Sequence, residues 1–147
     1  MERLSWAKYF LDMATAAASR SSCGRRQVGT VIVMDKMIIS TGYNGTPRGL
    51  PNCVDGGCRR FAENGNWPFD KSNCSHSEEN AIVQAARCGT KIEGATLYCT
   101  HSPCRMCSKM IINSGIKSVV YKELYPDSEG ALDMMRAAGV WVMIHEG

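Results

Sequence analysis

The first third of the chain carries a helical pattern of apolar residues followed by two extended ones. Near the N-terminus the apolar positions are Trp6, Phe10, Met13, Ala14 and Ala17. Their helical spacing predicts a helix over about residues 5–18. Two runs rich in β-branched residues follow at 28–33 and 37–43, and only Met34-Asp35-Lys36 separates them. Such runs joined by a short connection predict an antiparallel hairpin.

Helical and extended patterns alternate in the second half of the chain. The predicted elements are a helix at 77–88 before Gly89, a strand at 95–99, a helix at 104–114 before Gly115, a strand at 117–121, a helix at 128–138 before Gly139 and a strand at 140–144. Strands separated by helices pair in parallel through right-handed crossovers. We therefore expect an α/β fold in which a five-stranded mixed sheet carries helices on both faces.

A long irregular stretch, residues 44–75, lies between these two patterned regions. It is rich in glycine, asparagine and proline and contains three cysteines. A connection of this length without regular structure is uncommon inside a compact domain. We therefore expect this stretch to be functional or to be held by a metal ion.

Length and composition predict a single domain over residues 1–147. No apolar run approaches the roughly 20 residues that a membrane-spanning helix needs, and the first residues lack the apolar core of a secretory signal. The eight cysteines are therefore expected to be metal ligands and buried thiols in a reducing cytoplasm. The net charge of +3 is too small to indicate a nucleic-acid partner by itself.

Two short motifs carry the chemistry, namely His76-Ser77-Glu78 and Pro103-Cys104-Arg105-Met106-Cys107. His76, Cys104 and Cys107 supply one imidazole and two thiolates, which is one ligand fewer than a closed tetrahedral zinc site. Three protein ligands leave one position for water, whose pKa falls to about 7 on the metal. H-x-E followed by P-C-x-x-C is the signature of zinc-dependent nucleobase deaminases. The alternative is a purely structural zinc site, because C-x-x-C alone also occurs there.

Glu78 is the candidate catalytic acid and base of this motif. It would take a proton from the zinc-bound water and deliver protons to a ring nitrogen and to the departing ammonia. Glu79 is the rival carboxylate, although an acid in the first turn of a helix is ordinary. His101 is a rival metal ligand, but three ligands are already present without it.

Four further cysteines flank the two motifs: Cys23, Cys53, Cys58 and Cys74. In a reducing compartment they are expected to form a second, structural zinc site with four sulfur ligands. The alternative is that they are ordinary thiols without a metal, because their spacing matches no compact zinc knuckle.

Arginines gather near the first of these cysteines, since Arg20, Arg25 and Arg26 surround Cys23, and Arg48 follows the predicted hairpin. Guanidinium groups suit phosphate because they donate two parallel hydrogen bonds. We expect one or more of them to bind a substrate phosphate. The alternative for each is a solvated positive surface.

Four segments together resemble the deoxycytidylate (dCMP) deaminase family, within the cytidine deaminase fold. They are RQVGTVIV at 26–33, GYNGTPRG at 42–49, HSEENAI at 76–82 and SPCRMC at 102–107. The GYNG stretch discriminates this family from its relatives. Free-nucleoside deaminases have cysteine as the first zinc ligand, and tRNA adenosine deaminases lack the long cysteine-bearing loop. Ser77 stands where the family often has alanine.

The resemblance implies a cytidine deaminase-like three-layer α/β/α sandwich and the conversion of dCMP to dUMP and ammonia, which supplies thymidylate synthesis. It implies that Asn44 holds the deoxyribose, that Tyr125 lies against the pyrimidine and that Arg26 contacts the substrate. It also implies a homo-hexamer that dCTP activates and dTTP inhibits. The residues expected near the effector are Tyr43, Gly45 and Arg48.

Other functions stay open at this point. One is deamination of another cytosine or adenine substrate, such as a tRNA adenosine, although a nucleic-acid partner is not expected. The other is a non-catalytic protein that keeps the fold and its zinc as a scaffold. Glu78 favours an enzyme, because a scaffold has no need of this carboxylate.

Overall fold

Five strands form one mixed sheet in the order β2-β1-β3-β4-β5. The structure is a computed structural model, and it describes residues 1–58, 72–126 and 128–145. Its elements are α1 (Trp6–Ala18), β1 (Gly29–Met34), β2 (Met37–Tyr43), the 3₁₀ helix η1 (Cys53–Asp55), α3 (Ser77–Cys88), β3 (Thr96–His101), α4 (Arg105–Asn113), β4 (Ser118–Glu123), α5 (Glu129–Ala137) and β5 (Trp141–Ile144). Each element predicted from the sequence is present, with bounds that differ by one or two residues.

Strand directions follow from the connections between strands. β1 and β2 form the expected antiparallel hairpin, and both turn residues, Asp35 and Lys36, have positive φ angles of 51° and 64°. Two such residues in a row match the right-handed twist of the flanking strands. β3 pairs antiparallel with β1, whereas β4 lies parallel to β3 and β5 lies parallel to β4. The helices between these strands make the parallel crossovers that the alternating pattern predicts.

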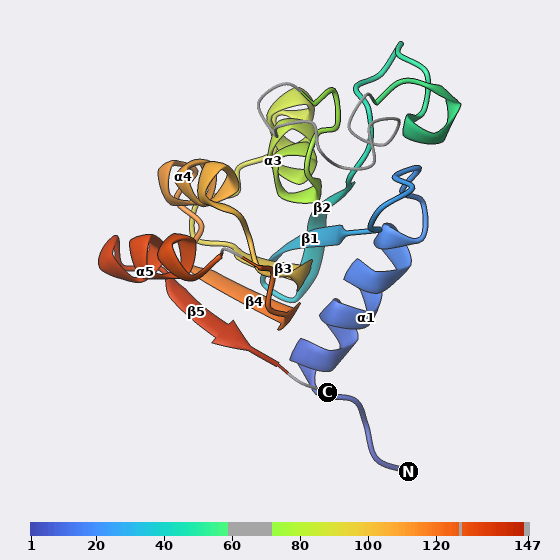
Figure 1. Cartoon of the computed structure of the whole chain (residues 1–147). Coiled ribbons are helices and arrows are strands. Elements are labelled where there is room, and N and C mark those ends of the chain that lie inside the picture. Colours follow the sequence, from blue (N-terminus) through green and yellow to red (C-terminus); the bar gives the residue numbers. More distant parts are fainter. Residues whose placement is uncertain (59–71, 127, 146–147) are drawn as a thin grey trace.

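Helices cover both faces of the sheet, which makes the three-layer α/β/α sandwich (Figure 1). On one face, Phe10 and Ala14 of α1 pack against Val31 and Val33 of β1. On the other face, α3, α4 and α5 share a larger core with β1, β3 and β4. The site-bearing helices α3 and α4 therefore lie on the same face.

Two glycines allow α1 and α3 to lie directly on the hairpin. A Cβ atom at Gly29 would collide with the carbonyl oxygen of Ala14, and one at Gly42 would collide with that of Ser77. The contact at Gly42 sets the height of the first turn of α3 above β2. Since His76 precedes this turn and Glu78 lies within it, Gly42 helps to place the His76-Ser77-Glu78 motif.

The stretch 44–75 is described only in part, because residues 59–71 lie outside the described residues. Its two ends meet in an isolated bridge, in which Gly45 and Ser75 exchange backbone hydrogen bonds of 3.1 and 2.8 Å. This bridge holds the chain beside the start of α3. Within the described part of the protein, we find no helix with the length and apolar character needed to cross a membrane.

Candidate active site

Both motifs lie at the starts of helices that face one another. His76 is the N-cap residue of α3, with an extended backbone at φ −79° and ψ 158°. Cys104 is the N-cap residue of α4, also extended at φ −77° and ψ 173°. Because His76 precedes the helix, its side chain and that of Glu78 are not constrained to opposite sides of a helix axis. The sequence prediction that both segments begin helices is confirmed.

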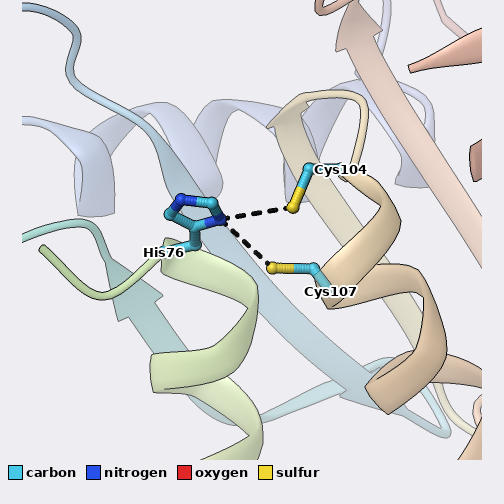
Figure 2. A group of neighbouring side chains, drawn as sticks. All are labelled: His76, Cys104 and Cys107. Carbon is cyan, nitrogen blue, oxygen red and sulfur yellow. Dashed lines mark hydrogen bonds between the residues drawn. The ribbon is translucent and has the colours of Figure 1, made fainter. Parts of the chain in front are cut away.

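His76, Cys104 and Cys107 have the geometry of a zinc site. Their ligand atoms all lie within 4.8 Å of one another, and the Nδ1 atom of His76 is 3.4 Å from each cysteine Sγ atom. Figure 2 shows the imidazole facing both sulfur atoms. Tetrahedral zinc with ordinary Zn–S and Zn–N bond lengths places N and S ligands about 3.5 Å apart. The three residues therefore fit zinc, and their donor set is one that zinc prefers.

Hydrogen bonds prepare one of the two cysteines for metal binding. The bond from Cys107, with a smaller contribution from His76, lowers the pKa of Cys104 to about 4, although burial opposes this shift. The same pairing, together with burial, raises the pKa of Cys107. Cys104 is therefore the more readily ionised of the two sulfur ligands. This matters because the thiolate is the form that binds metal.

Glu78 lies beside the metal ligands and is buried, with 4% of its surface exposed. Its Oε1 atom accepts a hydrogen bond of 2.5 Å from Ser77 Oγ and one of 3.4 Å from Cys99 Sγ. Glu78, Ser77 and His76 all line the same cavity. The carboxylate is thus held at the cavity wall next to the ligands, as a general acid and base must be.

Glu79, the rival carboxylate, has a structural role. Its Oε1 atom accepts a hydrogen bond of 2.7 Å from the backbone N–H of His76 and completes a capping box at the start of α3. A capping box satisfies two helix N–H groups that would otherwise lack a partner.

We expect Glu79→Ala to lower the free energy of unfolding by about 0.3–1.5 kcal/mol, because it removes one half of the capping box. Turnover should persist, because Glu78 is intact. Urea unfolding and ammonia release measured on the same preparation check both statements. Unchanged stability together with lost turnover would assign the proton transfer to Glu79.

The cavity has a volume of about 150 Å³ and brings the predicted substrate residues to the metal ligands. Its lining residues are Cys23, Arg25, Arg26, Val28, Asn44, Cys58, Ser72, Cys74, His76, Ser77, Glu78, His101, Ser102, Cys104 and Tyr125. Asn44, Arg26 and Tyr125, which are far apart in the sequence, therefore face one space. The guanidinium of Arg26 lies over the Tyr125 ring, 4.6 Å from its centroid.

Asn44 is mostly buried and holds the segment that carries Arg26. Its Nδ2 atom donates to the carbonyl of Arg26 at 2.8 Å, and its Oδ1 atom accepts from the N–H of Val28 at 2.8 Å. Counting only contacts with the described residues, one amide proton and one lone pair remain for a ligand. Asn44 thus shapes the cavity wall, and its contact with a sugar stays a prediction.

Two buried serines hold the loop that presents Tyr125. Ser102 Oγ accepts from the N–H of Tyr125 at 2.7 Å and donates to Ser128 Oγ at 2.9 Å. Ser128 Oγ in turn donates to the carbonyl of Tyr125 at 2.7 Å. Because Ser102 lies two residues before Cys104, the same segment positions a metal ligand and the aromatic ring.

His101 lines the cavity but is not one of the three grouped metal ligands. Its Nδ1 atom lies 2.9 Å from Thr100 Oγ1, and its Nε2 atom lies 3.2 Å from Glu123 Oε2. Burial lowers the pKa of its imidazole, although the charge of Glu123 opposes this. The sequence had suggested His101 only as a metal ligand, whereas the structure places it on the cavity wall.

Of the four cysteines expected to form a second zinc site, Cys23, Cys58 and Cys74 line the cavity, but within the described chain only His76, Cys104 and Cys107 lie close enough together to count as a metal-ligand group. Cys53 and Cys58 are buried, and Cys23 and Cys74 are partly exposed. The Cys74 Sγ atom lies 3.7 Å from the carbonyl oxygen of Ser75. An interaction with the Cys74 side chain lowers the pKa of Cys23 to about 5, against the effect of burial. None of the eight cysteines forms a disulfide in the described chain, which includes them all.

The residues expected near an effector lie apart from the substrate cavity. Tyr43 accepts a hydrogen bond from Asn80 through its carbonyl at 2.8 Å, and Arg48 contacts Gln84 at 3.4 Å. Gly45 takes part in the bridge to Ser75. None of the three lines the cavity. They follow the outer side of α3, so their role in effector binding stays a prediction.

Sequence reasoning missed two donors to Glu78. Ser77 lies inside the motif, but its hydroxyl was treated there as a neutral replacement for alanine. Cys99 carried no signal, because its contact with Glu78 depends on the register of β3 beside β1.

Comparison with known proteins decides the family. Residues 4–123 match the model described as "Cytidine and deoxycytidylate deaminase zinc-binding region". The chain belongs to this family. As a member of the cytidine and deoxycytidylate deaminase family, it is 45% identical over 140 residues to the deoxycytidylate deaminase of Saccharomyces cerevisiae. It is 37% identical over 165 residues to that of Enterobacteria phage T4, a match that covers 90% of this chain and 86% of the phage protein.

Solved structures agree with this family. The dCMP deaminase of cyanophage S-TIM5, in complex with dCMP and dUMP, has a TM-score of 0.84 and 32% identity, and the match covers 99% of this chain and 100% of that one. The alignment with the yeast protein covers 95% of this chain but only 45% of the yeast protein. The chain therefore spans less than half the length of its curated yeast relatives.

Proposed function

We propose that this chain catalyses the zinc-dependent hydrolytic deamination of dCMP to dUMP and ammonia. The observation that carries the proposal is that His76, Cys104 and Glu78 line one cavity with the predicted substrate residues, while Cys107 completes the ligand group with His76 and Cys104. The named yeast and phage relatives support the substrate, as does the dCMP and dUMP complex of the cyanophage enzyme. In this proposal, residues 1–147 form one zinc-dependent nucleotide deaminase domain.

The protein's own groups divide the work of the reaction. His76, Cys104 and Cys107 would hold zinc, which would supply Lewis-acid activation of the attacking water. Glu78 accepts a proton from this water and transfers it to the pyrimidine ring nitrogen. It then takes the remaining proton of the hydroxyl group added to the ring carbon and delivers it to the exocyclic amino group, which leaves as ammonia while the carbonyl of dUMP forms. One carboxylate can perform these transfers in turn because it lies beside the ligands at the cavity wall.

Substrate recognition uses the side of the cavity away from the metal ligands. Tyr125 offers an aromatic face to the pyrimidine. The guanidinium of Arg26 lies over the Tyr125 ring. Asn44 fixes the backbone of Arg26 and keeps donor and acceptor capacity for the deoxyribose. Arg25 and Arg26 bring two positive charges to the cavity, where they are placed to bind a 5′-phosphate.

We expect kcat/KM for deoxycytidine to be about 10²-fold or more below that for dCMP, because two charge-assisted hydrogen bonds to phosphate are lost. Ammonia release from dCMP, CMP, dCTP, deoxycytidine and a tRNA anticodon stem measures the preference. Equal kcat/KM values for dCMP and deoxycytidine would refute phosphate recognition. Activity on the tRNA stem alone would replace dCMP with an adenosine substrate, and no ammonia from any zinc-loaded sample would favour a scaffold.

A pair of arginine variants locates the phosphate contact. Arg26→Ala should lower kcat/KM for dCMP toward the value for deoxycytidine and leave deoxycytidine itself nearly unchanged. Arg20→Ala is the matched control, because Arg20 is exposed and does not line the cavity. If Arg26→Ala keeps the full preference for dCMP, phosphate recognition belongs to Arg25 or another residue.

The proposal extends to regulation and location. The family resemblance supports a homo-hexamer that dCTP activates and dTTP inhibits. In this form Tyr43, Gly45 and Arg48 would lie near the effector. Light scattering with and without each nucleotide tests the assembly, and initial rates test the control. A cytoplasmic location agrees with eight cysteines that form no disulfide.

A further inference from the structure

Three fully buried side chains lie behind the carboxylate of Glu78. Ser77, Thr30 and Cys99 each have an exposed fraction of 0%. They belong to three different elements, namely α3, β1 and β3. Ser77 Oγ lies 2.7 Å from Thr30 Oγ1, and Thr30 Oγ1 lies 3.2 Å from Cys99 Sγ. Together with Glu78 they close a small polar network inside an otherwise apolar core.

The direction of the hydrogen bonds in this network follows from the number of protons. An ionised carboxylate only accepts, whereas a hydroxyl or thiol has one proton to donate. Ser77 and Cys99 both donate to the same atom, Glu78 Oε1, at 2.5 and 3.4 Å. The lone pairs of Ser77 Oγ and Cys99 Sγ then remain to accept. The single hydroxyl proton of Thr30 can be donated to one of these two atoms at a time. Two donors from different elements therefore converge on one carboxylate oxygen.

The thiol of Cys99 is suited to this role. Burial, with a further contribution from the charge of Glu78, raises the pKa of Cys99 well above its usual value. The side chain therefore stays a protonated thiol, which is the form that donates. Its register position on β3, opposite Thr30 of β1, brings it beneath the first turn of α3.

We propose that Ser77 and Cys99 are positioning residues that hold Glu78 by Oε1 and so aim Oε2 at the reacting atoms. This inference rests on the proposed function, in which Glu78 carries the protons. Both side-chain hydrogen bonds that the described residues donate to this carboxylate end on Oε1. A glutamate side chain has three rotatable bonds, and displacement by about 1 Å costs up to about 10²-fold in rate.

Four variants test the proposal. Ser77→Ala and Cys99→Ala each remove one donor, Cys99→Ser keeps a donor of similar size, and Ser40→Ala is the matched control. Ser40 is a buried serine that donates to the carbonyl of Ala81 on the same helix α3 at 2.6 Å, without contacting Glu78. Zinc per chain, Tm, kcat and KM for dCMP are measured on each.

We expect Ser77→Ala and Cys99→Ala each to lower kcat about tenfold, with KM within about twofold and zinc retained, because only the aim of Glu78 changes. Cys99→Ser should recover most of the kcat that Cys99→Ala loses. Ser40→Ala should lower Tm and keep kcat. The double variant should lose less than the product of the single losses, since both donors act on one oxygen.

Wild-type kcat in both alanine variants would overturn the proposal, and so would a kcat loss in Ser40→Ala as large as theirs. A crystallographic measurement separates this proposal from the proposed function. If the zinc-loaded wild type releases no ammonia from dCMP, the proposed substrate is wrong, and the conformation of Glu78 still decides the positioning role. Glu78 should occupy one conformer in the wild type and several in the double variant. One unchanged conformer in both proteins would refute the positioning role of Ser77 and Cys99.

Discussion

Glu78→Gln should bind zinc as the wild type does and lose about 10²-fold to 10⁴-fold in kcat, because the amide cannot carry protons between water, ring nitrogen and ammonia. Glutamine has nearly the same shape as glutamate, and its amide oxygen can still accept the hydrogen bonds of Ser77 and Cys99. The metal ligands His76, Cys104 and Cys107 are unchanged. The substitution therefore isolates proton transfer from folding and from metal binding.

The adjacent carboxylate provides the control for this experiment. Glu79→Gln keeps the capping box, because glutamine also occupies this position of the motif, and it should keep turnover within about threefold. Zinc per chain is measured by elemental analysis, and turnover by ammonia release from dCMP. Near wild-type turnover in Glu78→Gln at full zinc occupancy would remove Glu78 from the mechanism.

The grouping of His76, Cys104 and Cys107 was predictable because they belong to two short motifs, each at the start of a helix. The spacing of His76, Cys104 and Cys107 indicated zinc, and free backbone N–H groups at helix starts favour anionic ligands. The structure adds that His76 and Cys104 are N-cap residues with extended backbones. Local chemistry was sufficient here because each motif is contained in a few consecutive residues.

Tertiary contacts determined what the sequence did not predict. Cys99 meets Glu78 only because β3 pairs with β1 in one register, with Thr30 opposite Cys99. Likewise, the helical spacing of α1 did not reveal which of its apolar residues are buried. Phe10 is 1% exposed, whereas Trp6 is 47% exposed. Close approach at Gly29 selects the face of α1 that contains Ala14 and Ala18.

A second, structural zinc site formed by four other cysteines stays a prediction. Cys23 follows α1, Cys53 and Cys58 lie in and after η1, and Cys74 precedes His76 by two residues. Among the described residues only His76, Cys104 and Cys107 have ligand atoms within 4.8 Å of one another, so binding of zinc by these four thiols requires them to move closer together and stays a prediction. Four sulfur ligands are a usual set for structural zinc. A metal held there would join the 44–75 stretch to the segment after α1 and brace the backbone that leads into His76.

We expect the intact protein to contain two zinc ions per chain and Cys53→Ser to contain one. The Tm of Cys53→Ser should fall by about 10 °C or more, because a structural zinc ion contributes folding free energy directly. Cys107→Ser should instead lose the catalytic zinc and keep the second one. Cys88→Ser is the control, since Cys88 is exposed and lies on the outer side of α3, and it should keep both ions.

Elemental analysis of the wild type decides the question even if a cysteine variant does not fold. One zinc ion per fully active chain would show that Cys23, Cys53, Cys58 and Cys74 are thiols without a metal. Two ions, with one retained after Cys107→Ser, would assign the second ion to the four cysteines. Because Cys74 leads directly to His76, loss of this second ion should also lower kcat, whereas an isolated structural site would leave kcat unchanged.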